Sequence, residues 1–204
     1  MSDDGAVAGP DGKLRCPWGL NPPEYIAYHD EEWGRPLHGD TAIFERLCLE
    51  GFQSGLSWLT ILRKRENFRS AFAGFDPETV ARFGTRDITR LLQDAGIVRH
   101  RGKIEAAIAN ARGTLTLREA GTPLDELVWS HRPKRRRAAP KSFKEVAATT
   151  PESAALSKEL KRAGFRFVGP TTVYAAMQAC GIVNDHLATC FVRTQVQREI
   201  DATL

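Results

Sequence analysis

The stretch "LKRAGFRFVGPTTVYAAMQACG", residues 160–181, holds the pattern that decides the fold. One helix is predicted to end at Gly164, the turn "FRFVGP" follows, and a second helix begins near Pro170. Two glycines five residues apart let the backbone approach a ligand, and the N–H groups at the start of the second helix would form an anion site. The hairpin, about residues 160–172, is therefore either a helix-hairpin-helix element that binds a DNA phosphate or an ordinary pair of helices.

Helices separated by short turns are predicted on both sides of this hairpin. The sequence has no internal repeat and no run of alternating strands. Asp40, Asp76 and Thr85 are expected to cap helices at their N-termini. The predicted helical segments are 40–67, 76–84, 85–96, 101–120, 151–164, 171–181 and 185–200, and 123–130 is predicted to be a short helix or a turn. Prolines and charges predict a surface loop at 131–150. The predicted fold class is all-α.

The chain has 204 residues, which suits one folded domain, predicted at 14–192. Residues 1–13 are polar and glycine-rich and are expected to be a disordered tail, and 193–204 a C-terminal tail. No stretch approaches the roughly 20 apolar residues of a membrane span, and the N-terminus lacks the layout of a signal peptide. We therefore expect a cytoplasmic protein with no membrane attachment.

Basic residues exceed acidic ones, giving a formal net charge of +4 and a sequence pI of about 9.0. They cluster at 63–69, 99–103, 131–141 and 158–166. Such clusters can bind the phosphates of a nucleic acid, or they can be solvated faces and one flexible loop. The charge pattern alone leaves both interpretations open.

The cysteines and histidines suggest a metal site. The four cysteines are Cys16, Cys48, Cys180 and Cys190, and no two form a CxxC pair. His186 and Cys190 are four residues apart, as on one face of a helical turn, and Cys16 and His29 make a second candidate pair. Together they are either a Cys₂His₂ set typical of structural zinc, which would clip the two ends of the chain together, or four unrelated residues. The other two cysteines are expected in the core.

A glutamate interrupts an apolar helical stripe in the stretch "LCLEGF", residues 47–52. Ile43, Leu47 and Glu50 follow the i, i+4, i+7 pattern, and Glu50 lies about 20° from Ile43 around the helix axis. Glu50 is either a rim residue whose carboxylate reaches water or a carboxylate placed inside the protein for chemistry.

These segments together resemble one family, DNA-3-methyladenine glycosylase I of the constitutive bacterial type, within the helix-hairpin-helix DNA glycosylase superfamily. The matching stretches are "RCPWG", "YIAYHDEEWG", "LCLEGFQSGLSWLTILRKRENFR", "QDAGIVRHRGKIEAAIANAR" and "LSKELKRAGFRFVGPTTVYAAMQACGIVNDH", followed by Cys190. They occur in order over about residues 14–190. The resemblance implies a helix-hairpin-helix glycosylase domain at 14–192 that excises 3-methyladenine from alkylated double-stranded DNA and leaves an abasic site in base excision repair.

The resemblance also implies roles for particular residues. It implies one structural Zn²⁺ held by Cys16, His29, His186 and Cys190. It implies a base pocket with Glu50 as the catalytic and base-reading carboxylate and with aromatic walls from Trp18, Tyr25, Tyr28, Trp33 and Trp58. Trp58 is the expected stacking residue, because it follows Glu50 by little more than two helical turns. Through the hairpin, it implies DNA contacts at Gly164, Phe165, Gly169 and Thr171, and it suggests a monomer that releases free 3-methyladenine.

Two features bear on the reaction. Bifunctional members of the superfamily carry a lysine just after the last hairpin glycine, whereas this sequence has Pro170 and Thr171, so hydrolysis without strand cleavage is expected. Many members use an aspartate downstream of the hairpin. Asp185 lies near that position and is either catalytic, a helix cap or a partner of His186. The alternatives to this activity are a DNA-binding module without catalysis and a glycosylase for other alkylated bases.

Overall fold

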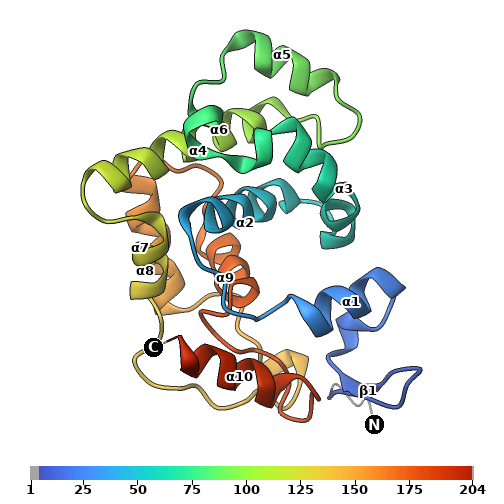
Figure 1. Cartoon of the computed structure of the whole chain (residues 1–204). Coiled ribbons are helices and arrows are strands. Elements are labelled where there is room, and N and C mark those ends of the chain that lie inside the picture. The colour runs from blue at the N-terminus through green and yellow to red at the C-terminus, as the bar shows by residue number, and fades with distance from the viewer. Residues whose placement is uncertain (1–4, 204) are drawn as a thin grey trace.

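The computed structural model describes residues 5–203, which are mostly helical, as the sequence predicts (Figure 1). Its α-helices are α1 (Pro23–Glu31), α2 (Asp40–Gln53), α3 (Trp58–Ala71), α4 (Pro77–Ala81), α5 (Thr85–Gln93), α6 (Arg101–Glu119), α7 (Leu124–Ser130), α8 (Pro151–Arg162), α9 (Pro170–Ala179) and α10 (Arg193–Ala202). Short 3₁₀ helices are η1 (Pro17–Gly19), η2 (Ala73–Phe75) and η3 (Phe143–Glu145). The strands β1 (Val7–Ala8) and β2 (Leu14–Arg15) pair antiparallel.

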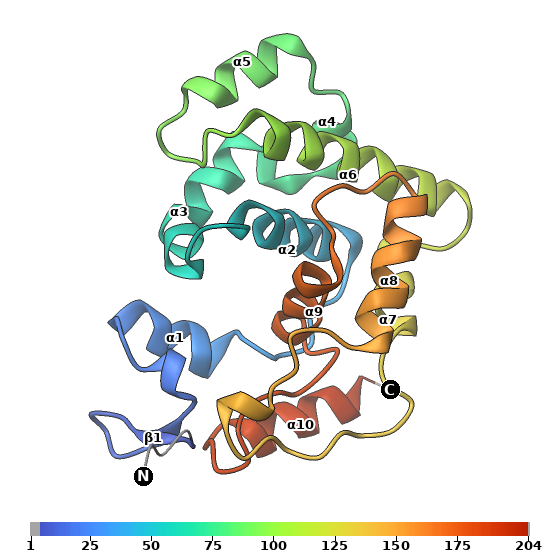
Figure 2. The same cartoon turned by 180° about the vertical axis from the view of Figure 1, so that it is seen from behind.

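Helix α2 is the centre of the structure. It packs against α3, α6, α7 and α9, and side chains on almost all its sides are buried. Figures 1 and 2 show α2 and α9 in the middle, with α4, α5 and α6 on one side and α10 on the other. Because α2 is surrounded by other helices, even its charged residues Arg46 and Glu50 are buried. No helix within residues 5–203 has the length and apolar character needed to cross a bilayer.

The predicted helix at 40–67 is wrong in one respect, because the chain breaks between α2 and α3. Gly55 has φ of +79°, which favours glycine, and Ser57 caps α3 by accepting a hydrogen bond from the Thr60 N–H at 3.2 Å. Lys103 Nζ donates to the carbonyl oxygens of Phe52 at 2.9 Å and Ser54 at 2.5 Å. These bonds satisfy carbonyl groups at the end of α2, so α2 and α3 are separate helices.

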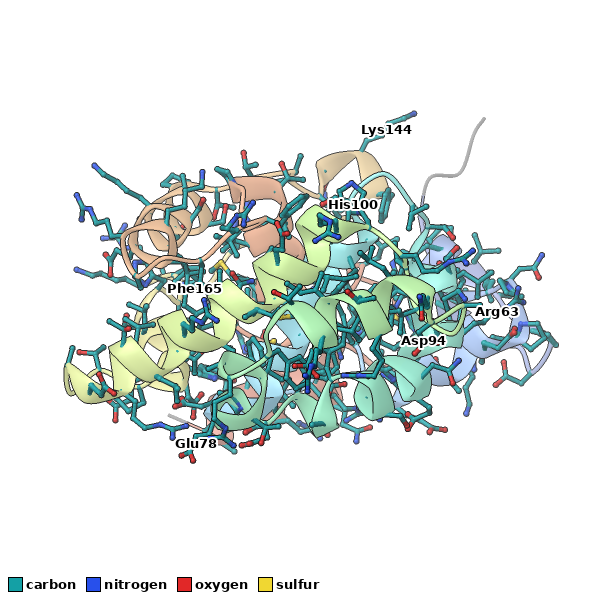
Figure 3. The ribbon with its side chains drawn as sticks, turned by 90° about the horizontal axis from the view of Figure 1, so that it is seen from above. Arg63, Glu78, Asp94, His100, Lys144 and Phe165 are labelled. Carbon is teal, nitrogen blue, oxygen red and sulfur yellow. The ribbon has the colours of Figure 1, made fainter. Side chains whose placement is uncertain are left out.

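The predicted hairpin is present as α8, a loop and α9. Gly164 has φ of +91° just after α8, and Pro170 opens α9. The Asn110 side chain holds the loop, since its Oδ1 accepts from the Arg166 N–H at 2.7 Å and its Nδ2 donates to the Arg166 carbonyl at 3.2 Å. Phe165 packs on α6 where a glycine leaves room, and Figure 3 labels it beside that helix. Helix α6 therefore fixes the position of the hairpin.

The helix caps were predicted with mixed accuracy. Asp76 caps α4 as predicted, accepting from the Thr79 N–H at 2.8 Å. Asp40 and Thr85 are instead the first residues of α2 and α5. The Asp40 carboxylate accepts the Asp125 N–H at 3.0 Å, so it joins α2 to α7.

Both predicted tails differ from the structure within residues 5–203; residues 1–4 and 204 lie outside the described part. At the N-terminus, β1 pairs with β2, and the buried Arg15 side chain bonds both Asp11 and Asp30. At the C-terminus, α10 buries Val196 and Ile200 one turn apart. The predicted helix at 185–200 therefore begins only at 193, and the folded unit extends beyond 14–192 at both ends.

Candidate active site and metal centre

The six residues predicted for the base pocket line one pocket of about 430 Å³. They come from three regions: the N-terminal segment through α1 to Trp33, helix α2 and the start of α3. Helix α9, the segment 143–148 and Asp185 complete the lining. The ribbon in Figure 2 shows α1, α2, α3 and α9 around this region. A pocket of this volume is within the range that holds a small molecule.

Aromatic rings form a continuous wall on the α1 side of the pocket. The Trp18 ring lies 4.9 Å from Trp33 and 5.9 Å from Tyr25, in both cases edge to face. Tyr28 lies 5.4 Å from Trp58, which stands on α3 across from it. Trp58 therefore reaches the pocket from its own helix, and the predicted spacing of two turns along one continuous helix does not apply. Such electron-rich faces attract cations.

Glu50 projects into the pocket from α2 and is only 6% exposed. Within residues 5–203 its carboxylate accepts no hydrogen bond, and the nearby Arg46 guanidinium is the only charge opposing the effect of burial on its pKa. Burial raises the pKa of Glu50 from 4.5 to about 7. The alternative in which Glu50 is a rim residue whose carboxylate reaches water is therefore wrong. The carboxylate is instead poised to ionise when a positive charge approaches.

A network of hydrogen bonds holds the floor of the pocket near Glu50. Arg46 donates to the Tyr28 hydroxyl at 3.0 Å and to Glu32 at 2.8 Å, and its guanidinium lies 5.2 Å from the Trp58 ring centre. The indole Nε1 of Trp58 is buried, and it has no partner within the described residues. A buried polar group without a partner is unusual in a folded protein.

A further part of the pocket wall combines Asp185, one of whose sequence alternatives was a catalytic role, with Tyr174 and Gln178, which the sequence did not single out. Asp185 accepts hydrogen bonds from the Tyr174 hydroxyl at 2.5 Å and from Gln178 at 2.9 Å, and all three line the pocket. Arg137 in turn donates to the Tyr174 hydroxyl at 2.8 Å. The side-chain partners of Asp185 are thus on α9, and the predicted alternative of a bond to His186 is wrong. Gln53 at the end of α2 is a further lining residue that the sequence did not single out.

The four hairpin residues expected to contact DNA have different surroundings. Thr171 is exposed at the start of α9 and lines the pocket, and Gly164 is exposed in the loop. Gly169 precedes α9 as its N-cap residue. Phe165, however, is 3% exposed and belongs to the core, so its side chain cannot contact DNA. Its aromatic ring was needed to pack the hairpin on α6.

The four predicted metal ligands come together as a buried cluster. One possible ligand atom from each of Cys16, His29, His186 and Cys190 lies within 4.8 Å of all the others. The Cys190 Sγ is 3.5 Å from His29 Nε2 and 3.6 Å from His186 Nδ1. His186 and Cys190 approach through turns in an irregular segment, so the helical turn predicted for them is wrong.

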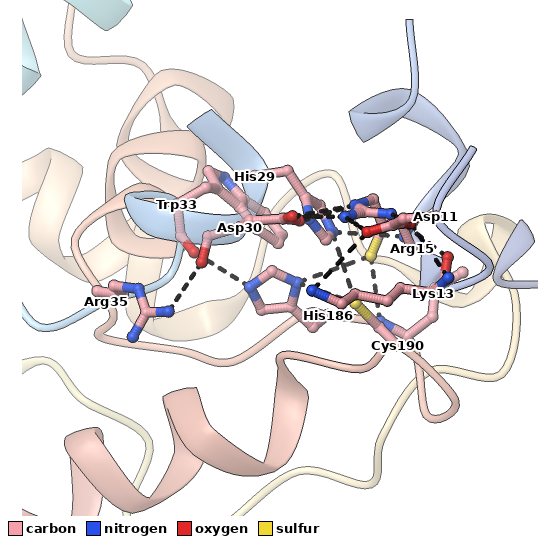
Figure 4. Close-up of polar contacts among 11 residues, drawn as sticks. Asp11, Lys13, Arg15, His29, Asp30, Trp33, Arg35, His186 and Cys190 are labelled. Atoms are coloured by element: carbon pink, nitrogen blue, oxygen red, sulfur yellow. Dashed lines mark hydrogen bonds and ion pairs between the residues drawn. The ribbon is translucent and has the colours of Figure 1, made fainter. Parts of the chain in front are cut away.

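Neighbouring groups orient these side chains, as shown in Figure 4. His29 Nδ1 donates to Asp30 at 2.8 Å, and His186 Nε2 donates to the Trp33 carbonyl at 3.0 Å, so the other nitrogen of each ring faces the cluster. The pKa of the Cys190 thiol is lowered, because Cys16 donates a hydrogen bond to it and both imidazoles lie beside it. Imidazoles that are oriented from outside the cluster, together with an easily ionised thiol, suit a bound metal ion.

Comparison with known proteins agrees with this geometry. The family model for methyladenine glycosylase matches residues 18–193. DNA-3-methyladenine glycosylase 1 of Escherichia coli (strain K12) is 52% identical over 179 residues, which are 86% of this chain and 95% of that protein. A crystal structure of 3-methyladenine DNA glycosylase I superposes with a TM-score of 0.84 at 49% identity, covering 87% of this chain and 98% of that one. A tyrosine-to-phenylalanine variant of such an enzyme, crystallised in complex with 3-methyladenine, has a TM-score of 0.83 at 37% identity, covering 88% and 97%. This chain therefore belongs to the methyladenine glycosylase family.

Proposed function

We propose that this protein is a DNA glycosylase that releases 3-methyladenine from alkylated double-stranded DNA during base excision repair. The observation that carries this proposal is the buried Glu50 carboxylate in an aromatic pocket of about 430 Å³. A protein that merely binds DNA has no use for a carboxylate buried at such a cost. The family membership and the 3-methyladenine held by a related enzyme support the same base.

The pocket distinguishes the damaged base by its charge. Methylation at N3 makes the adenine ring of the nucleotide cationic, and adenine also carries an exocyclic amine that donates hydrogen bonds. Glu50 accepts from that amine and balances the ring charge, while Trp58 and the other rings stack on the base. The damaged nucleotide must first rotate out of the duplex, which costs less for a damaged base than for an intact one.

The reaction is hydrolysis of the bond between the base and the deoxyribose. A cationic base is a good leaving group, because it takes both electrons of the bond to the sugar and departs as neutral 3-methyladenine. Glu50 holds and orients the base, and water adds to the sugar cation and loses a proton to the solvent. Pro170 and Thr171 stand where a Schiff-base lysine would be needed for strand cleavage. The product is therefore an abasic site in an intact strand, together with free 3-methyladenine.

DNA binds on the face where the α8–α9 hairpin, a helix-hairpin-helix element, meets the pocket mouth. Backbone N–H groups at Thr171 point away from the start of α9 and bind a phosphate, as helix N-termini do. Leu56 is 43% exposed at the tip of the loop between the pocket residues Gln53 and Trp58. An exposed apolar side chain at this position wedges into the base stack and fills the space left by the rotated nucleotide.

The Cys₂His₂ cluster holds one structural Zn²⁺ in this proposal. Two thiols and two imidazoles are a closed tetrahedral donor set for zinc, which then has no open position for substrate. When bound, the metal supplies a cross-link between the N-terminal hairpin and the segment before α10, and no step of the reaction passes through it. A single copy of the chain contains the whole site, in keeping with a cytoplasmic monomer.

The decisive experiment is to incubate methylated duplex DNA with the protein and to identify the bases released by chromatography. Free 3-methyladenine above the spontaneous rate, with no strand nick before alkali treatment, is the expected result. Binding of the DNA without release of any base would favour the binding module. Release of 7-methylguanine or uracil as fast as 3-methyladenine would favour the glycosylase of different scope, because Glu50 selects a cationic adenine.

A further inference from the structure

A second cavity, of about 70 Å³, lies between helix α10 and the loop that follows α7. Its lining includes five arginines and two aspartates: Arg132, Arg135, Arg136, Arg137, Arg193, Asp185 and Asp201. The lining residues carry five guanidinium groups and two carboxylates, so positive charges outnumber negative ones by three around a small cavity. Like charges brought this close repel one another unless an anion lies between them.

Three of the arginines are held in place by the protein. Arg136 forms an ion pair with Asp201 at 2.8 Å, Arg137 donates to the Tyr174 hydroxyl at 2.8 Å, and Arg193 donates to a backbone carbonyl at 3.0 Å. Of these three acceptors, only the Asp201 carboxylate carries a full negative charge. The guanidinium groups are thus oriented by neighbours that leave most of their charge for another partner.

The remaining two arginines, Arg132 and Arg135, also line this cavity, and they line the neighbouring surface pocket beside α8 as well. Within residues 5–203, neither side chain makes a hydrogen bond or an ion pair. Their guanidinium forks match the geometry of a phosphate group, which accepts paired N–H donors and can carry two negative charges. The cavity volume suits one such oxyanion and is far too small for a nucleoside.

We propose that this arginine cavity binds a phosphate group, provided either by the backbone of the DNA or by free phosphate in solution. The site depends on α10, which begins at Arg193, where the match to the family model ends. The cavity also adjoins the base pocket. Asp185 lines both, and the bonds from Arg137 to Tyr174 and from Tyr174 to Asp185 connect them. An anion beside Arg137 would therefore be linked to the base pocket by the hydrogen bonds that join Arg137, Tyr174 and Asp185.

The test compares Arg135→Gln with Arg86→Gln in the full chain. Arg86 is exposed on α5, which Figure 1 places at the opposite end of the molecule from α10, so this control removes the same charge elsewhere. In one arm, inorganic phosphate is titrated into each protein by calorimetry, with chloride at matched ionic strength as the reference. In the other, affinity for an undamaged duplex is measured as a function of salt concentration.

Saturable phosphate binding that weakens about tenfold in Arg135→Gln, and not in Arg86→Gln, would support free phosphate as the ligand. The logarithm of the DNA-binding constant falls linearly with the logarithm of the salt concentration. A slope that is shallower by about one in Arg135→Gln alone would support a backbone phosphate as the ligand. If the two variants behave alike in both arms, the proposal is overturned. Release of 3-methyladenine is assayed separately, so failure here leaves the proposed activity untouched.

Discussion

Replacing Glu50 with glutamine should make the folded protein more stable while making the enzyme worse. Burial raises the pKa of Glu50 from 4.5 to about 7, although Arg46 opposes the shift. Between these two pH values the folded chain holds a proton that the unfolded chain has released. The stability that this proton contributes is complete below pH 4.5 and is lost as the pH rises through 7. At about 1.4 kcal/mol for each pKa unit, the loss amounts to about 3 kcal/mol.

Glutamine never ionises, so Glu50→Gln should avoid this loss. We expect the variant and the natural protein to unfold with similar free energies near pH 5, and the variant to be more stable by about 3 kcal/mol above pH 7. Urea denaturation at intervals from pH 5 to 8.5 measures the difference. Glu31→Gln, which makes the same change at an exposed site on α1, should show no such trend. A stability difference that does not grow with pH would refute the reasoning.

Glu50→Gln should slow excision, although it raises stability. A carboxylate and a cationic base about 4 Å apart attract each other by about 4 kcal/mol at an effective dielectric constant of about 20. With its pKa near 7, Glu50 is ionised at pH 8 at little cost. We therefore expect Glu50→Gln to lower kcat/KM for excision roughly a hundred- to thousandfold at pH 8. In the natural protein kcat/KM should rise with pH through 7 as Glu50 ionises, and the variant should lack this rise. A variant that excises at the natural rate at pH 8 would show that the charge of Glu50 plays no part.

Four further predictions follow from the geometry. Purified protein should contain one Zn²⁺ per chain by elemental analysis, and its removal by a chelator should lower Tm; protein purified without chelator that contains none would rule out the site. Gly19→Ala puts a Cβ 2.6 Å from the His29 ring and should reduce the metal content, whereas Gly84→Ala, with nothing within 4 Å, should not. Asn110→Ala removes both bonds to the hairpin loop, so urea denaturation should detect a loss of about 1–3 kcal/mol and gel shift a weaker DNA complex. Leu56→Ala should change stability by less than about 0.5 kcal/mol but slow excision from duplex more than from single-stranded DNA.

Features set by neighbours in sequence could be predicted. The hairpin follows from Gly164 and Pro170, and the cap of α4 follows from Asp76, because each acts within one turn. The break between α2 and α3 has the same kind of signal in Gly55 and Ser57. The apolar periodicity of the flanking segments continues across this break and hides the signal of the two breaker residues.

Features set by distant contacts could not be predicted from spacing. Arg15 orders the N-terminal strands only because α1 brings Asp30 to it, and α10 folds only because a buried cluster around Cys190 accepts its apolar side. The wall made by Tyr174 and Asp185 depends on a pairing across eleven residues with no motif of its own. The cysteines and histidines suggested the metal ligands, and the resemblance to a family supported them and supplied the aromatic residues, but only the folded chain brings the two groups into contact.

Contacts between the Cys₂His₂ cluster and the pocket wall bear on what the proposed metal ion would do for the pocket. The ring of Trp18 lies 5.3 Å from His29, and the ring of Trp33 lies 4.6 Å from His186, so each imidazole of the cluster supports one tryptophan of the pocket wall. A clip that merely tied the chain ends would leave the pocket intact when the metal is lost. In this protein the two imidazoles that a metal ion would hold in place pack directly against Trp18 and Trp33 of the pocket wall. Loss of the metal should therefore weaken base binding along with stability, because the wall loses the support behind it.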